Sequence, residues 1–213
     1  MSILIRGSSQ KLHLKALIAL CVIVAVCTGG FPQVRSDARD LSGLEYQVKA
    51  GFIYNFAKFT EWPKNLPYDS NSSLILSVIS NNDAVSDAFL ALNGKIVGGK
   101  NIQVKMCVTV RDLKDCHILF LDSTDRKFIQ EVLRTVKDRQ VLTVGHGPGF
   151  TQEGGIINFF IEDGKLRFEV NRDAEKRAGI KLGSQILRSA EIITEGSPSS
   201  LLEEIGSEGK ERQ

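Results

Sequence analysis

The glycine-rich segment Gly145-His-Gly-Pro-Gly-Phe150 is the first stretch of the sequence that could carry chemistry. Glycine-rich loops bind phosphate through backbone N–H groups, but this one lacks the Lys-Ser/Thr ending of a phosphate loop and the spacing of a dinucleotide fingerprint. A hairpin is predicted to follow it, so no helix N-terminus is available there to hold a phosphate. We therefore predict a connecting loop, in which His146 is an isolated candidate ligand for an anion or a metal.

The remaining residues do not form the ligand set of a metal site or the nucleophile–base pair of a catalytic site. Beyond the N-terminal segment the histidines are His117 and His146, whereas a zinc site usually takes three or four His, Cys or carboxylate ligands. Cys116 and His117 are adjacent, and adjacent side chains on a strand point to opposite faces, which prevents a nucleophile–base pair. The sequence contains no Gly-x-Ser-x-Gly elbow. We predict no catalytic set, no metal and no cofactor, and therefore a protein that is not an enzyme.

Two cysteines, Cys107 and Cys116, remain once the N-terminal segment is set aside. In an exported protein they are candidates for one disulfide, which would stabilise the fold by roughly 2–3 kcal/mol on the chain-entropy model. The alternative is two thiols packed on neighbouring strands.

Three polar residues beside apolar faces are candidates for contacts to a small ligand: Asn55, Lys58 and Arg167. For Asn55 the alternative is a hydrogen bond to the backbone, which is where most buried amides bond. For Lys58 and Arg167 the alternative is a salt-bridged surface.

The N-terminal region predicts export. Arg6, Lys11 and Lys15 precede a short apolar run, residues 16–26, followed by small residues, which is the layout of a signal peptide. The run is well short of the ~20 residues that span a bilayer. We assign residues 1–37 to a signal peptide and linker, with lipid anchoring at Cys27 left open, residues 38–194 to one domain, and residues 195–213 to a disordered tail. A net charge of +2 argues against nucleic acid as a partner.

A long helix over residues 42–62 is the first element that must position these residues. One apolar face of this helix is predicted from residues that recur at helical spacing, with Asn55 as its one polar member: Leu44, Val48, Phe52, Asn55, Phe59 and Trp62. Tyr46, Ala50, Ile53 and Ala57 form a second apolar arc, so the helix is predicted to pack against a sheet on a broad front.

Apolar strands and amphipathic helices alternate after this helix. Strands are predicted at residues 74–80, 102–108, 117–122 and 141–144, and residues 155–171 form a hairpin about the turn residues Asp163-Gly164. Asn171 is placed to cap a short helix that ends at Gly179. The pattern predicts an α/β fold, namely a single-domain sandwich with a mixed β-sheet flanked by helices.

These stretches together resemble the YfiR family. The resemblance is carried by residues 46–63, by residues 115–121 and 141–144, and by the closing signature at residues 154–164, 167–171 and 178–187. It implies a periplasmic regulator whose best-known relative represses a membrane-bound diguanylate cyclase by binding its periplasmic part. The family often carries a cysteine where this chain has Ser77, so a disulfide here would join Cys107 to Cys116.

Two functional hypotheses follow. In the first, the protein is an exported, non-enzymatic regulator that binds a diguanylate cyclase or another membrane sensor through apolar residues near the C-terminus: Ile180, Leu182, Ile186 and Leu187. The alternative for these four side chains is that they complete the core. In the second, it is a periplasmic small-molecule sensor. The sequence leaves homodimer formation open.

Overall fold

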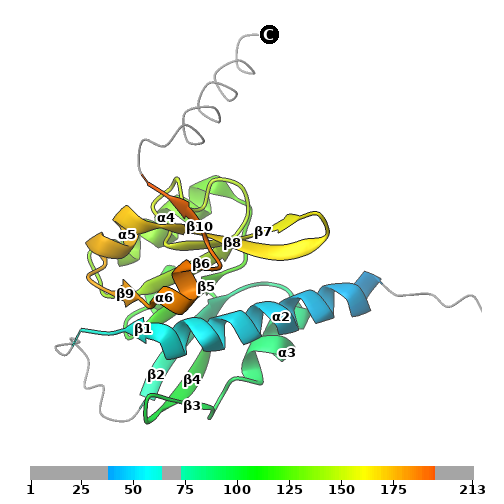
Figure 1. The fold of residues 1–213 in the computed structure, drawn as a ribbon. Coiled ribbons are helices and arrows are strands. Elements are labelled where there is room, and N and C mark those ends of the chain that lie inside the picture. The colour runs from blue at the N-terminus through cyan, green and yellow to red at the C-terminus, as the bar shows by residue number, and fades with distance from the viewer. Residues whose placement is uncertain (1–37, 64–72, 195–213) are drawn as a thin grey trace, which may run out of the picture. The chain divides into compact units, whose positions relative to one another are not determined.

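One eight-stranded sheet organises the part of the chain that the structure, a computed structural model, describes, namely residues 38–63 and 73–194 (Figure 1). Its strand order is β10-β8-β7-β6-β5-β2-β4-β3. The strands are β2 Ser73–Ile79, β3 Ile96–Val97, β4 Lys100–Cys107, β5 Ile118–Leu121, β6 Leu142–His146, β7 Ile157–Glu162, β8 Lys165–Asn171 and β10 Glu191–Ile193. The β3–β4 and β7–β8 pairs are antiparallel and the others parallel, so the predicted mixed sheet is confirmed. The predicted signal peptide and tail lie outside the described residues.

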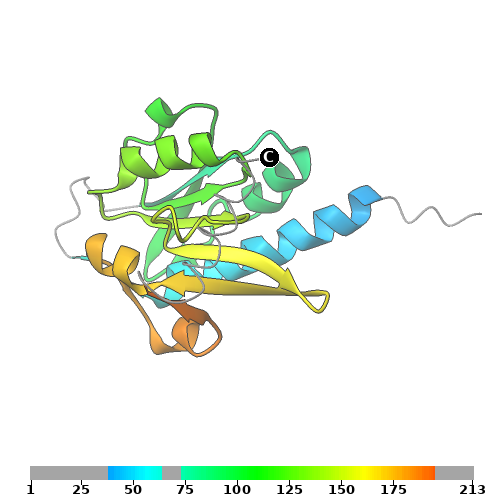
Figure 2. The ribbon, with the colours of Figure 1, turned by 90° about the horizontal axis from the view of Figure 1, so that it is seen from above.

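Helices cover both faces of this sheet, as Figure 2 shows from above. On β5, Ile118 and Phe120 belong to the core that contains α2 (Ala38–Phe59) and α3 (Asp83–Leu90). Leu119 and Leu121, between and after them, belong to the core that contains α4 (Arg126–Val136). Because successive side chains of a strand point to opposite faces, the two cores lie on opposite sides of the sheet. The predicted α/β sandwich is therefore confirmed.

Side-chain caps fix where two of these helices begin. Asn82 Oδ1 accepts a hydrogen bond from the Ala84 N–H at 3.0 Å, as its position before α3 predicts. At α4 the cap is Asp125, whose Oδ1 accepts from Lys127 N and Phe128 N at 2.9 and 3.2 Å. A carboxylate at this position also interacts favourably with the positive end of the helix dipole. From Asp125 onward, apolar residues at helical spacing fill the α4 side of the core: Ile129, Val132, Leu133 and Val136.

The predicted hairpin forms from β7 and β8. Asp163 and Gly164 take φ values of 50° and 70°, the left-handed region that its two-residue turn requires. The apolar first arm is not buried along its whole length, since Ile161 is 57% exposed. The reason is that β6 ends at His146, opposite Phe159, so the rest of β7 pairs with β8 alone.

The predicted burial of α2 on a broad front is confirmed for one of its two apolar arcs and wrong for part of the other. The helix begins at Ala38 and buries the second apolar arc, so that Leu44 and Val48 are 58% and 43% exposed and Asn55 is exposed as well. The buried arc consists of Tyr46, Ala50, Ile53, Phe56 and Ala57. Two of its members are alanines, and small side chains let a helix approach a sheet closely.

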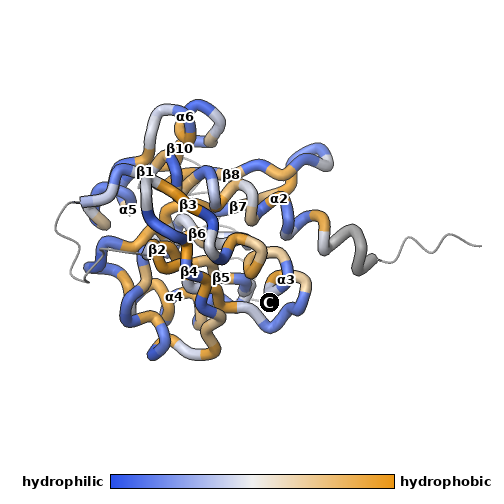
Figure 3. Tube along the Cα trace, turned by 90° about the horizontal axis from the view of Figure 1, so that it is seen from below, coloured by the Kyte–Doolittle hydropathy of each residue, from blue (hydrophilic) through white to orange (hydrophobic). Residues whose placement is uncertain are grey.

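Short elements complete the described part of the chain. The C-terminus of α2 continues into β1 (Thr60–Glu61), which pairs antiparallel with β9 (Lys181–Leu182) in a separate two-stranded sheet. The remaining elements are η1 (Val110–Asp112), α5 (Arg172–Arg177) and α6 (Ser184–Leu187). Asn171 caps α5 by accepting from Asp173 N and Ala174 N, as predicted. Hydrophobic segments in Figure 3 run along the central strands. No helix within the described ranges has the length and apolar character of a membrane span.

Candidate functional site

Three polar residues meet at the carboxyl edge of the central parallel strands. Ser80 directly follows β2, Asp122 directly follows β5, and His146 is the last residue of β6. The carboxyl ends of parallel neighbours lie at one edge of a sheet, and β2, β5 and β6 are consecutive in the strand order. The fold therefore assembles a site from residues that are far apart in the sequence.

Asp122 is the centre of this cluster. Its Oδ2 accepts a hydrogen bond from Ser80 Oγ at 2.5 Å, and its Oδ1 accepts from the Tyr46 hydroxyl at 3.1 Å and contacts Nε2 of His146. Burial alone would raise the pKa of Asp122, but the hydrogen bonds from His146 and Ser80 outweigh it and hold that pKa below its usual value. Burial, together with the neighbouring carboxylate of Asp122, raises the pKa of Tyr46 to about 12.

The cluster lies at a topological switch point. The connection after β2 leads to α3 on one face of the sheet, whereas the connection after β5 leads to α4 on the other face. In open α/β sheets, ligands bind in the crevice outside the strand ends where such connections diverge. Ser80 and Asp122 directly follow the two strands whose connections diverge, and the buried Tyr46 of α2 bonds to Asp122 at this point.

A cavity of about 380 Å³ adjoins the cluster, bounded by α2, the loop after His146 and the β7–β8 hairpin. Lys49 lines it and is 1% exposed. Its ammonium lies 2.6 Å from Glu45 Oε1 and 4.7 Å from the centre of the Tyr46 ring. The glycine-rich segment is thus a connecting loop, as predicted, and it also forms one wall of a cavity.

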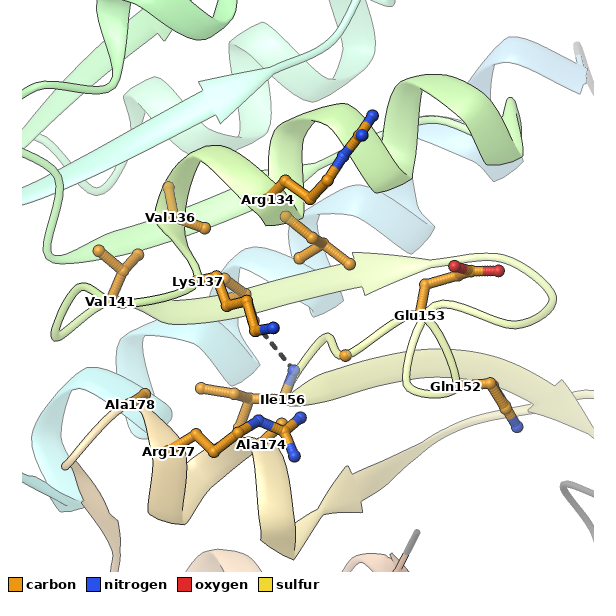
Figure 4. A pocket seen from close by; sticks show the side chains of 13 residues that line it. Arg134, Val136, Lys137, Val141, Gln152, Glu153, Ile156, Ala174, Arg177 and Ala178 are labelled. Atoms are coloured by element: carbon orange, nitrogen blue, oxygen red, sulfur yellow. Dashed lines mark hydrogen bonds between the residues drawn. The ribbon is translucent and has the colours of Figure 1, made fainter. Parts of the chain in front are cut away.

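A second cavity, of about 340 Å³, lies between α4 and α5 (Figure 4). Arg134, Lys137 and Arg177 stand around it in this view. All three are in or just after the last turn of a helix, where cations interact favourably with the terminal carbonyl groups. Arg134 Nε also donates to the carbonyl of Gln130, one turn earlier in α4, at 3.2 Å. Helix-end electrostatics account for these cations, so they do not indicate a ligand.

The three residues predicted to contact a small ligand do not form one site. Asn55 and Lys58 are exposed on α2, and the Lys58 ammonium lies 5.3 Å from the centre of the Phe59 ring. Arg167 Nε lies 2.6 Å from Glu162 Oε2, which is the surface salt bridge given as its alternative. Its neighbour on β8, Phe168, packs against rings of α2, so Arg167 points to the other face of the sheet.

The predicted partner surface near the C-terminus is largely inaccessible. Ile180, Leu182 and Ile186 are 5%, 2% and 4% exposed and belong to the core on the α2 side of the sheet. Leu187 is partly buried against the same core. The burial of the first three residues corresponds to the alternative in which they complete the core. A partner could reach this stretch only through Leu187 and its polar neighbours.

Cys107 and Cys116 are both buried on the α4 side of the sheet, as thiols with no bond between them. Cys116 Sγ lies 3.0 Å from the carbonyl oxygen of Ile118, and Cys107 Sγ lies 3.6 Å from that of Lys105. Burial raises the pKa of both thiols, that of Cys116 to about 11. The side chain of Ser77 lies beside both sulfur atoms.

Sequence reasoning missed Tyr46, Lys49, Ser80 and Asp122 as members of a site. A signal was present for two of them, since Ser80 and Asp122 each come directly after an apolar run predicted as a buried strand. Lys49 could not be recognised in this way, because a lysine on a helix is usually exposed.

Comparison with known proteins places the chain in a family. A solved structure, a conserved domain protein from Vibrio cholerae, matches with a TM-score of 0.45 and 10% identity. That match covers 68% of this chain and 59% of the other. A family model described as YfiR/HmsC-like matches residues 46–191, which is more than half of the sequence. The chain therefore belongs to the YfiR/HmsC-like family, a family of periplasmic regulators.

Proposed function

We propose that this protein is an exported regulator that binds the periplasmic part of a membrane-bound diguanylate cyclase and represses it. Membership of the YfiR/HmsC-like family supports the class of function. The observation that carries the proposal for this chain is a set of exposed apolar side chains on α2 and on the β7–β8 hairpin.

That surface consists of Leu44, Val48 and Ile161, and we call it the α2–hairpin surface. Leu44 and Val48 lie one helical turn apart, and the half-buried Phe52 continues their stripe toward the hairpin, where its ring is 5.8 Å from that of Phe159. Figures 1 and 2 both place the hairpin alongside the N-terminal half of α2. The three apolar side chains are between 43% and 58% exposed.

Leu44 and Val48 are exposed although their spacing is typical of the buried face of a helix. Burying a side chain of this size is worth roughly 1.5–3 kcal/mol relative to leaving it exposed. A helix with apolar residues on two arcs can bury one against its own sheet and offer the other to a partner. We propose that the partner segment supplies apolar side chains to the α2–hairpin surface, in place of the C-terminal stretch that the sequence suggested.

The geometry around Asp122 differs from that of a serine nucleophile site. In a serine nucleophile site the hydroxyl donates to the imidazole, and the imidazole donates to the carboxylate. Here the Ser80 hydroxyl donates directly to Asp122, and His146 contacts the same carboxylate from another side. The imidazole is therefore not placed between hydroxyl and acid, and it cannot take the proton of Ser80.

Co-purification tests the proposed function. The chain carrying an affinity tag is recovered from envelope extracts in wild-type form, as Leu44→Glu/Val48→Glu, and as the control Leu90→Glu, which changes another exposed leucine, on α3. We expect the wild type and the control to bring down a cyclase-bearing membrane protein, and the double variant to lose it. Recovery of no such protein by the wild type would contradict the proposed function, and equal recovery by all three would contradict the proposed surface.

A further inference from the structure

We propose that the cavity between α2 and the hairpin binds a small organic carboxylate with an apolar body, whose carboxylate group pairs with the ammonium of Lys49. The inference concerns the isolated chain and does not depend on the proposed partner. It rests on a buried cation, an exchangeable internal carboxylate, an oriented histidine and an apolar wall.

Lys49 is the first part of the argument. A buried ammonium requires a partner of opposite charge, since an isolated buried charge is strongly disfavoured. Its only ion-pair partner among the described residues is Glu45. An ammonium carries three donor hydrogens, and that of Lys49 also lies over the face of the Tyr46 ring. Lys49 can therefore take a further acceptor from the cavity that it lines.

Glu45 is the second part. Its side chain is 40% exposed, so it can turn to solvent at little cost in solvation. A ligand carboxylate can occupy the same position while its apolar body is buried against the cavity wall. Glu45 then acts as an internal occupant of the anion position, which a ligand displaces.

His146 supplies a second polar contact. Its Nε2 is held by Asp122, which in turn is fixed by Ser80 and Tyr46. Its Nδ1 has no hydrogen-bond partner within the described ranges, and the residue lines the cavity. An imidazole ring that is held at one nitrogen presents its other nitrogen in a defined direction. Because Nε2 donates to Asp122, Nδ1 is an acceptor in the neutral ring, and it can receive a hydrogen bond from a hydroxyl or N–H group on the body of the ligand.

The apolar wall is formed by the hairpin, through Phe159, Ile161 and Leu166. Glu169 also lines the cavity, but its Oε1 already accepts hydrogen bonds from Thr151 Oγ1 at 2.5 Å and Asn158 Nδ2 at 2.9 Å. This carboxylate is thus satisfied within the chain and does not require a cationic ligand. At about 380 Å³ the cavity lies within the usual range for small-molecule sites.

The test is a titration of the full chain with hexanoate, followed by amide resonances in ¹H–¹⁵N NMR spectra. Hexylammonium and 1-hexanol are matched probes with the same chain and a different head group. We expect hexanoate to shift the resonances of Lys49, Gly147 and Ile161 and to bind at least about tenfold more tightly than either of the other two, because only its head group matches the charge of Lys49. Tighter binding of hexylammonium or 1-hexanol, shifts confined to other residues, or no binding of hexanoate would overturn the proposal.

Two substitutions with opposite expected effects make the test specific. Lys49→Met keeps the apolar stem and removes the charge, and it should weaken hexanoate binding about tenfold or more. Glu45→Gln removes the competing charge with little change of shape, and it should strengthen binding about threefold. Lys58→Met, on the same helix and outside the cavity, is the control and should change nothing. Weaker binding by the folded Glu45→Gln variant, or unchanged binding by Lys49→Met, would show that the Lys49–Glu45 pair is an ordinary helix salt bridge.

Discussion

The hydroxyl of Tyr46 lies 3.1 Å from Oδ1 of Asp122, and this hydrogen bond joins α2 to the carboxyl edge of the central strands. It connects two positions 76 residues apart in the sequence. Because Asp122 also bonds to Ser80 and His146, one carboxylate holds together α2, β2, β5 and β6. The position of α2 determines both the α2–hairpin surface and the cavity beside Lys49. Because the hydrogen bonds of Asp122 hold α2 in place, they also position these two features.

Tyr46→Phe should destabilise the protein by about 1–2 kcal/mol, because it removes one donor from a buried charged acceptor. Urea unfolding measures this change. Tyr54→Phe is the matched control, since the Tyr54 hydroxyl donates to the Ile96 carbonyl at 3.2 Å in an exposed position. The control should change stability by less than about 0.5 kcal/mol. Equal effects of the two substitutions would mean that the Tyr46–Asp122 bond contributes nothing special.

Asp122→Asn should destabilise the protein near neutral pH and have a much smaller effect in acid. The pKa of Asp122 is lower in the folded state than in the unfolded state, so its stabilising contribution is fully present above the unfolded value of about 4 and is lost as the pH falls through the folded value. Free energies of unfolding measured between neutral pH and pH ~3 should therefore converge for the variant and the wild type. A difference that is independent of pH would contradict this assignment.

His117 predicts a second pH dependence. Burial, aided by the positive charge of Lys100, lowers its pKa from 6.5 to about 4, and its Nδ1 accepts a hydrogen bond from the Ile75 N–H at 3.1 Å. Between these pH values the unfolded chain binds a proton that the folded chain does not, so stability falls as the pH is lowered from about 6.5 toward 4. The fall due to this group is at most ~3.4 kcal/mol.

His117→Asn tests this contribution, since its amide oxygen can accept the same hydrogen bond without titrating. The free energy of unfolding of the variant should vary less than that of the wild type over this pH range. Equal slopes for the two proteins would show that another group titrates.

Cys107 and Cys116 are proposed to form a disulfide when the protein is exported, although the structure has them as buried thiols. Protein isolated from the periplasm should show no reactive thiol after unfolding, whereas protein made in a reducing cytoplasm should show both. In the folded reduced protein, thiol reagents should act slowly, because burial raises the pKa of each thiol and disfavours the reactive thiolate. Two thiols titrating in the periplasmic material would refute the disulfide.

Local patterns in the sequence were sufficient to predict much of the fold. The hairpin follows from Asp163-Gly164 between two strand-like arms, and the buried strands follow from apolar runs such as residues 118–121. The choice of the buried face of α2 could not be predicted. Both arcs of that helix are apolar, and only packing against the sheet selects the one that contains Ala50 and Ala57.

The candidate site was harder to predict for a different reason. Asp122 and His146 become neighbours through the strand order β5–β6, and Tyr46 joins them only because α2 crosses the strand ends. None of these contacts is local in sequence. The apolar residues near 180–187 show the converse difficulty, because periodicity alone does not distinguish a side chain that completes a core from one that meets a partner.

The most direct test of the account is the cellular level of cyclic-di-GMP in a deletion strain complemented with wild type, Leu44→Glu/Val48→Glu or Leu90→Glu. We predict that deletion raises the level, that the wild type and Leu90→Glu restore it, and that the double variant, present in the periplasm in equal amount, does not. An unchanged level on deletion, or full restoration by the double variant, would contradict the claim that this protein represses a cyclase through the exposed face of α2.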